Sequence, residues 1–192
     1  GGLFRIQSRG NSGQYVYENS STHKASTQAK TSATSSRMRQ MWIIEHDDNG
    51  FSLRNSYTGY YLQNDYTCSQ NKYYWTIQLS PNNTSDADKY IIICHGAVKS
   101  GTNNCMNLSG GTSGLCDWRY DNDRNSEWVL LQVPSKEVDS ATVKANLDKI
   151  CQTGKIDLEA GAYYQFINLN GGVMTERISD ATVVAQDADA NA

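Results

Sequence analysis

Short apolar segments alternate with polar turn segments along the first 133 residues of the chain. The apolar segments are rich in aromatic and β-branched residues, and they include residues 15–17, 42–44, 75–79 and 128–131. Between them lie clusters of Gly, Asn, Asp and Ser, the residues that favour turns; residues 47–50 (DDNG) are one example. Many short strands joined by such turns are typical of a barrel or sandwich, so the pattern predicts an all-β domain.

The pattern repeats three times. Residues 40–44 have counterparts at 88–92 and 126–130, and each copy places a large aromatic residue two positions after a polar one and directly before an aliphatic run. A period of roughly 40–45 residues divides the domain into repeats at about 1–48, 49–95 and 96–133. Three units of four strands form a closed barrel with one capped end. We expect the repeated aromatic residues to lie in its core; they are Trp42, Tyr90 and Trp128.

Specific motifs accompany the repeat. Gln40-Met41-Trp42 is a Gln-x-Trp motif, and the third copy contains the runs CMNL (105–108), LCDW (115–118) and NSEW (125–128). Residues 3–133 therefore resemble the ricin-type β-trefoil lectins, whose corresponding motifs are Cys-x-Asp-apolar, apolar-Gln-x-Trp and Asn-Gln-x-Trp. Asn107 replaces the family's Asp, while Cys116 and Ser126 stand where Gln is usual. The resemblance implies a β-trefoil of three four-stranded repeats that binds carbohydrate.

The resemblance also implies which residues bind the sugar. In each repeat of the family, the site combines an acid after the second strand, an aromatic residue on the third strand and an Asn beside the Gln-x-Trp motif. In the third repeat these positions are Asn107, Trp118 and Asn125. Trp118 would stack on the apolar face of a sugar ring while the two amides orient its hydroxyls, unless Trp118 packs in the core or at its rim instead.

The first two repeats match the site pattern less well. Gln63 occupies the acid position in the second repeat and Tyr17 occupies it in the first, where residues 25–30 offer no aromatic side chain. We therefore expect weak glycan binding, mainly at the third repeat. Two other functions stay open: a degenerate trefoil that serves as a protein-interaction or structural scaffold, and an accessory domain of a larger secreted glycan-active enzyme. A scaffold would carry a sizeable apolar patch away from Trp118.

After Pro134 the pattern changes. Val143, Leu147 and Ile150 form the apolar stripe of a short amphipathic helix, so residues 134–154 are predicted to be a helical linker. Such a single-stripe helix docks on a neighbouring domain or binds a partner.

The last segment, residues 155–192, repeats the beginning of the chain. Residues 162–166 resemble residues 2–6, and the interval from Glu176 to Gln186 equals the interval from Glu18 to Gln28. The segment is therefore predicted to form the opening strands of a second trefoil-like unit. So short a piece cannot build its own core, so we expect it to contact the first domain or another chain, which includes self-association.

Charge and motif content argue against several other functions. Lys+Arg 17 against Asp+Glu 20 gives a net charge of −3, which lacks the basic field that nucleic-acid binding requires. No apolar run reaches the ~18–20 residues of a membrane span. The three histidines lack metal-ligand spacing, and the Asp121–Asp123 turn lacks the Gly and distal Glu of a calcium loop. No nucleophile elbow or phosphate loop is present, so we expect no enzyme activity, cofactor or metal.

Cysteine usage bears on location. The five cysteines include no Cys-x-x-Cys pair. Four of them could form up to two disulfides and leave one free, and the interpretations that we weigh are one bridge and buried free thiols. The surface is rich in Ser, Thr and Asn and poor in Lys, which suits an exported protein. We therefore expect a multidomain protein that is secreted or lies on a bacterial cell surface.

Overall fold

The computed structural model describes residues 3–85, 89–134 and 137, together with the backbone of three strands between residues 166 and 186. The chain divides into two compact units, residues 1–133 and residues 134–192, and each is described by itself. Among the described residues, no helix is long and apolar enough to cross a membrane. The linker helix predicted for residues 134–154 lies outside the described residues, Pro134 and Glu137 excepted.

The first unit is all-β, as predicted, and one short α-helix is its only α-helix among the described residues. That helix, α1 (Thr34–Arg39), was not expected from the sequence. The strands are β1 (Leu3–Ser8), β2 (Tyr15–Asn19), β3 (Lys24–Gln28), β4 (Trp42–Asp47), β5 (Gly50–Asn55), β6 (Tyr61–Leu62), β7 (Cys68–Ser69), β8 (Thr76–Leu79), β9 (Tyr90–Cys94), β10 (Cys105–Leu108), β11 (Leu115–Trp118) and β12 (Trp128–Gln132). Two 3₁₀ turns, η1 (Ser109–Gly111) and η2 (Arg124–Ser126), flank β11.

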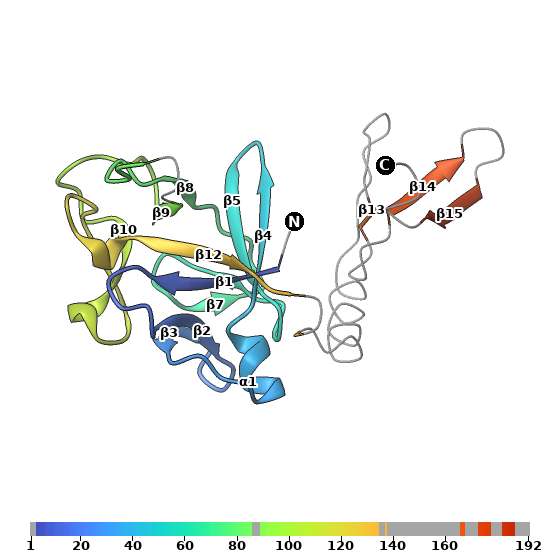
Figure 1. Ribbon diagram of the computed structural model, residues 1–192, viewed down its shortest axis with the longest axis horizontal. Coiled ribbons are helices and arrows are strands. Elements are labelled where there is room, and N and C mark those ends of the chain that lie inside the picture. Colours follow the sequence, from blue (N-terminus) through green and yellow to red (C-terminus); the bar gives the residue numbers. More distant parts are fainter. Residues whose placement is uncertain are drawn as a thin grey trace. The chain divides into compact units, whose positions relative to one another are not determined.

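The first and last strands of this unit pair with each other. β1 is antiparallel to β12 from Phe4↔Gln132 to Ser8↔Trp128, and β1 also pairs with β2 and β4 (Figure 1). All twelve strands belong to one hydrogen-bonded sheet. β4 and β5 form a hairpin in which Asp47 pairs with Gly50, whose φ of +125° explains a glycine at this turn.

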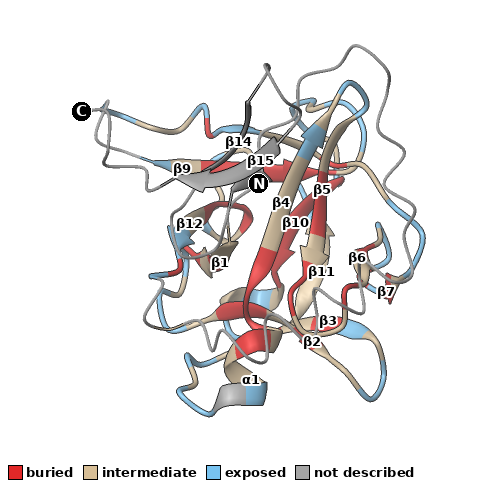
Figure 2. Cartoon of the chain, turned by 90° about the vertical axis from the view of Figure 1, so that its right-hand side faces the viewer, coloured by how far each residue is buried: buried red, intermediate tan, exposed pale blue. Residues whose placement is uncertain are grey.

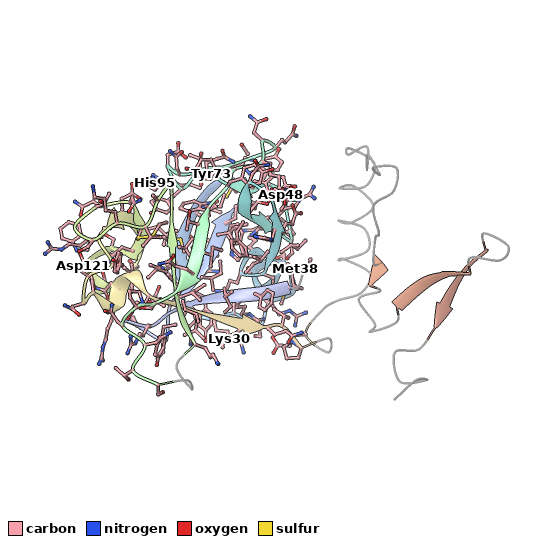
Figure 3. The ribbon with its side chains drawn as sticks, turned by 90° about the horizontal axis from the view of Figure 1, so that it is seen from above. Lys30, Met38, Asp48, Tyr73, His95 and Asp121 are labelled. Atoms are coloured by element: carbon pink, nitrogen blue, oxygen red, sulfur yellow. A yellow bond between two sulfur atoms is a disulfide. The ribbon has the colours of Figure 1, made fainter. Side chains whose placement is uncertain are left out.

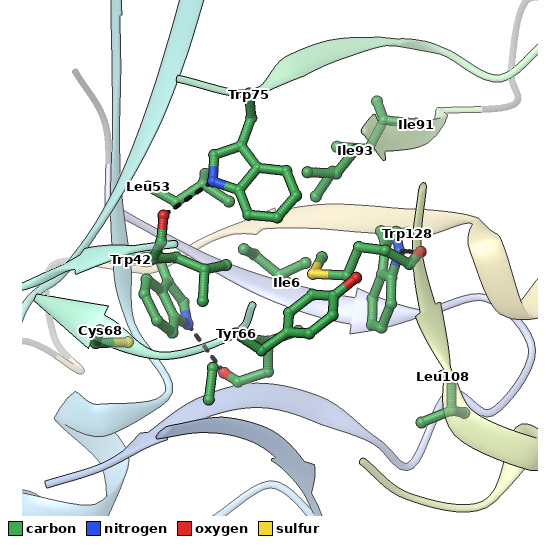
Figure 4. Packing of buried hydrophobic residues seen from close by; sticks show 14 residues of the cluster. Ile6, Trp42, Leu53, Tyr66, Cys68, Trp75, Ile91, Ile93, Leu108 and Trp128 are labelled. Atoms are coloured by element: carbon green, nitrogen blue, oxygen red, sulfur yellow. Dashed lines mark hydrogen bonds between the residues drawn. The ribbon is translucent and has the colours of Figure 1, made fainter. Parts of the chain in front are cut away.

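Tryptophan side chains build the centre of the core. Trp42, Trp75 and Trp128 are fully buried, and each indole N–H donates to a backbone carbonyl (Figure 4). The acceptors lie on β2, β6 and β10, the first strands of the hairpins β2–β3, β6–β7 and β10–β11: Val16 O at 3.0 Å, Leu62 O at 3.0 Å and Met106 O at 2.9 Å. These bonds satisfy the polar atom of each ring inside an apolar cluster, which makes complete burial possible.

One of the three core residues was assigned wrongly from the sequence. Tyr90 is only half-buried, and the Arg9 guanidinium lies 3.8 Å from the centre of its ring. In its place Trp75, which precedes β8, supplies the indole that bonds the β6 strand. Tyr90 directly precedes the aliphatic run of residues 91–93, as the pattern requires, but the core position of this part of the chain is filled by Trp75 instead. Figure 2 shows buried residues along β10 and in part of β5, and β9 is buried from Ile91 to Cys94.

The cysteines adopt both of the states that the sequence allowed. Cys94 and Cys105 are directly opposed on β9 and β10 and form a disulfide. Cys68 and Cys116 are free, and burial raises the pKa of the Cys68 thiol well above its ordinary value. Cys151 lies outside the described residues.

The second unit contains a three-stranded sheet in the order β13–β14–β15. Its strands are β13 (Phe166–Ile167), β14 (Val173–Arg177) and β15 (Thr182–Gln186). The pairing of β14 with β15 reproduces the pairing of β2 with β3. A constant offset of 158 converts all five pairs of the first hairpin, from Tyr15↔Gln28 onward, into the five pairs of the second, from Val173↔Gln186 onward.

Candidate functional site

The polar residue of the Gln-x-Trp pattern donates a side-chain hydrogen bond to the backbone directly after the β2–β3 or the β10–β11 hairpin. Gln40 donates from Nε2 to Ala29 O at 2.7 Å, directly after β3. Ser126 donates from Oγ to Arg119 O at 2.8 Å, directly after β11. Gln40 and Ser126 are both fully buried. The motif thus positions each hairpin relative to the core indole two residues later, and Ser126 takes over this role although it replaces Gln.

The pairing of β10 with β11 divides their side chains between two faces. Asn107 is opposite Cys116 and Cys105 is opposite Trp118, so these four side chains share one face. Met106 and Leu108 alternate with them and belong to the hydrophobic core. Asn107 and Trp118 are therefore on the outer face of the hairpin, as diagonal neighbours about 7–8 Å apart.

Trp118 is exposed on this outer face. Its exposed fraction is 43%, in contrast to the three buried tryptophans of the core. The Arg119 guanidinium lies 5.9 Å from the centre of the Trp118 ring. The indole is thus available to solvent, and it does not belong to the core clusters formed by the described residues.

Asn107 lies beneath this surface. Only 4% of it is exposed, and its Nδ2 donates to Asp123 Oδ2 at 3.1 Å and to Ser126 Oγ at 2.8 Å. The free thiol Cys116 Sγ lies 3.7 Å from Asn107 Oδ1. Both amide hydrogens are therefore used inside the protein, and Asn107 links the hairpin to the η2 turn.

Asn125 reaches the same carboxylate by its backbone. Its N–H donates to Asp123 Oδ1 at 2.9 Å, which makes Asp123 the N-cap of η2. The Asn125 side chain packs against two glycines: a Cβ added at Gly10 would lie 2.1 Å from Asn125 Oδ1, and one at Gly111 would lie 3.4 Å from it. Any side chain at residue 10 would overlap the Asn125 side chain, so the observed position of Asn125 requires Gly10.

The structure thus brings Asn107 and Asn125 together on the two oxygens of Asp123. Trp118 shares the outer face of the β10–β11 hairpin with Asn107. Sequence reasoning missed Asp123 as part of this group. A signal was present, since an Asp two residues before Asn125 is a typical capping residue for a short helical turn. Capping alone does not show that its second oxygen meets a residue on a distant strand.

Asp117 lies on the opposite face of the β10–β11 hairpin and connects β11 to two other parts of the chain by hydrogen bonds. Tyr66 donates its hydroxyl to Asp117 Oδ1 at 2.7 Å, and His95 Nε2 lies 2.9 Å from Asp117 Oδ2. Burial, and then the Asp117 carboxylate, raise the pKa of the Tyr66 hydroxyl well above its ordinary value, so it remains a donor. Tyr73 and His95, both labelled in Figure 3, each make an edge contact with the Trp75 ring. These contacts fix β11 against the core and leave its outer face free to carry Trp118.

Metal-ligating groups and exposed apolar side chains are two further features of the described part of the chain. No group of three or more His, Cys, Asp or Glu residues there could hold a metal ion. Large exposed hydrophobic side chains there come from three different strands, namely Leu79 on β8, Trp118 on β11 and Leu131 on β12.

Comparison with solved structures identifies the fold. The Macrolepiota procera ricin B-like lectin, solved with lactose, matches with a TM-score of 0.56 at 15% identity, over 68% of this chain and 95% of the lectin. A GlcNAcα1-4Gal-releasing endo-β-galactosidase from Clostridium perfringens matches with a TM-score of 0.53 at 18% identity, over 69% of this chain and 33% of the enzyme. The first unit therefore has the ricin-type β-trefoil fold.

A third match extends further along the chain. A mosquitocidal holotoxin matches with a TM-score of 0.53 at 15% identity, over 97% of this chain but only 21% of the toxin. The chain thus spans about a third of the endo-β-galactosidase and about a fifth of the holotoxin. No protein-family model and no curated protein sequence matches it.

Proposed function

We propose that residues 3–133 form a non-catalytic carbohydrate-binding module that binds glycans weakly, mainly at the part of the third repeat to which Asn107, Trp118 and Asn125 belong. The observation that carries the proposal is the exposed Trp118 ring on the outer face of the hairpin, the face that also carries Asn107 and, through it, the Asp123 carboxylate. An apolar ring face beside fixed polar groups suits the two kinds of surface of a pyranose. The Macrolepiota lectin, which shares the fold, was solved with lactose, which supports this class of ligand.

The binding experiment compares Trp118→Ala with the unchanged chain. Glycan-array screening of the 192-residue protein selects the best neutral glycan, and NMR titration with that glycan and with lactose measures affinity. Trp118→Ala is expected to abolish binding while leaving the thermal midpoint nearly unchanged, because the ring is exposed. Leu79→Ala is the control, since it removes an exposed apolar side chain outside the site. Wild-type protein that binds no glycan, or Trp118→Ala protein that binds normally, would refute the proposal.

We also propose that the module belongs to a longer exported protein. The small share of the endo-β-galactosidase and of the holotoxin that it spans supports an accessory role beside another domain. The Cys94–Cys105 disulfide supports an oxidising compartment, where such bridges persist. Mass spectrometry after thiol alkylation without reduction should find these two cysteines unmodified. A scaffold without a ligand is the alternative that a silent glycan array would favour.

Residues 155–192 are, in this proposal, the opening strands of a second trefoil-like unit. The shared register of β14–β15 and β2–β3 supports this, as does the match of the holotoxin over 97% of the chain. β13 and β15 each pair with β14 alone among the described strands, and such edges favour pairing with further strands. Light scattering across a concentration series should give a mass above 21.3 kDa, and a constant 21.3 kDa would exclude self-association.

A further inference from the structure

Asn107 cannot serve a sugar directly in the way that an exposed acid would. Both of its amide hydrogens are donated inside the protein, to Asp123 and Ser126. Its amide oxygen faces the Cys116 thiol, and only 4% of the residue is exposed. The position where the resemblance implies a sugar-binding acid is therefore a buried connector.

Asp123 has the properties that Asn107 lacks. It is half-buried, and each of its oxygens accepts one hydrogen bond from the protein, from Asn107 on one side and from the Asn125 N–H on the other. A carboxylate offers about four acceptor positions, so about two remain for a ligand. Its own N–H donates to Tyr120 O at 3.3 Å, which further fixes the loop.

Asp123 is also coupled to Trp118 by a short hydrogen-bonded path. Asn107 contacts both Asp123 and Ser126, and Ser126 in turn bonds the carbonyl of Arg119, the residue after Trp118. The carboxylate and the indole are thus parts of one ordered structure on the outer side of the β10–β11 hairpin. Preordered groups of this kind lose little conformational entropy on binding.

We propose that Asp123 is the carboxylate that accepts hydrogen bonds from the sugar, and that Asn107 is a positioning residue that holds it. This inference rests on the proposed carbohydrate-binding function. The ligand class is a neutral sugar that presents two adjacent hydroxyl donors to Asp123 and an apolar ring face to Trp118. The acidic group of the site is then Asp123, in the loop before η2, and not a residue at position 107 on β10.

The substitution Asn107→Asp separates this assignment from the alternative. If residue 107 contacts the sugar, a carboxylate there strengthens binding through charge-assisted hydrogen bonds. If Asp123 is the acceptor, the new carboxylate faces Asp123 across the present 3.1 Å contact and removes the donor that holds it. Repulsion then displaces Asp123, so binding weakens at pH 7.

Asp123→Asn provides the direct test. Asn is as good an N-cap as Asp, so the variant preserves the η2 turn while removing the charged acceptor. Affinity for the best neutral glycan of the array should fall about tenfold to a hundredfold, the value of charge-assisted bonds, with little change in the thermal midpoint. Asp123→Ser, which also caps helices, is the second variant should the first fail to fold. Leu79→Ala remains the control.

The outcomes distinguish the two proposals. Loss of binding in Trp118→Ala and Asp123→Asn, with weaker binding in Asn107→Asp at pH 7, supports the assignment. Full loss in Trp118→Ala with Asp123→Asn and Asp123→Ser within twofold of wild type overturns it and leaves the proposed function standing. Tighter binding by Asn107→Asp overturns it as well. A wild-type protein that binds no glycan overturns both.

Discussion

Replacing Arg9 with Met is expected to destabilise the first unit strongly, because it leaves a buried carboxylate without its counter-charge. Arg9 Nη1 lies 2.5 Å from Glu127 Oε2, and only 1% of the Glu127 side chain is exposed. The other oxygen of Glu127 accepts hydrogen bonds from Ser80 and Asn82. The ion pair therefore joins the end of β1 to the residue between η2 and β12, and through Ser80 to the chain after β8.

The size of the effect follows from burial. Removing one partner of a buried ion pair costs about 3–5 kcal/mol, against less than about 1 kcal/mol for an exposed pair. Loss of the Arg9 contact with the Tyr90 ring adds about 1 kcal/mol, whereas the bonds from Ser80 and Asn82 persist and keep the total near the middle of that range. At about 2–4 °C per kcal/mol for a chain of this size, the thermal midpoint should fall by roughly 10 °C.

Urea denaturation followed by tryptophan fluorescence measures the change, since three of the four tryptophans are buried in this unit. Lys72→Met is the control, because it breaks the exposed ion pair with Asp47 and should have a much smaller effect. In a double-mutant cycle, Arg9→Met should cost far less in a Glu127→Gln background. A loss below about 1 kcal/mol for Arg9→Met, or additive effects in the cycle, would refute the reasoning.

Three further predictions concern single contacts. Trp75→Phe should lower the free energy of unfolding by about 2–4 kcal/mol, measured in urea, because it leaves Leu62 O unpaired and a cavity in the core. Gly10→Ala should displace Asn125 and weaken glycan binding in NMR titrations, whereas Gly13→Ala, with only a side-chain oxygen 3.3 Å away, should not. Hydrogen bonds from Lys72 and then the Asn49 N–H lower the pKa of Asp47 from 3.8 to about 2. The stability it contributes is therefore present above pH 4 and disappears as the pH falls from 3.8 toward 2, so wild type and Asp47→Asn should have converging thermal midpoints in that interval.

Much of the fold was accessible from the sequence because its signals are local. Alternating apolar residues and turn residues predict short strands whatever their partners, and the residues before each aliphatic run correctly placed Trp42 and Trp128 in the core. The second hairpin was also visible, since the interval from Glu176 to Gln186 copies that from Glu18 to Gln28, and the paired registers agree. These inferences depend on residues near one another in the chain, so no knowledge of long-range pairing was needed.

The candidate site could be predicted only in part. Asn107, Trp118 and Asn125 followed from motif positions, and the structure brings the Asn107 side-chain amide and the Asn125 backbone N–H to one carboxylate. The carboxylate itself, Asp123, was missed because its role depends on a contact between a loop and a strand sixteen residues earlier.

By itself, the sequence determined the all-β class and the burial of Trp42 and Trp128, because periodicity and turn chemistry are properties of short segments. Only the tertiary structure decided that Trp75 rather than Tyr90 fills the core, that Cys94 pairs with Cys105, and that Asp123 joins Asn107 to Asn125. Each of these depends on which distant segments meet and on the direction in which their side chains point. Strand pairing determines which segments meet, and burial determines which side chains point inward, where each buried polar atom needs a hydrogen-bond partner.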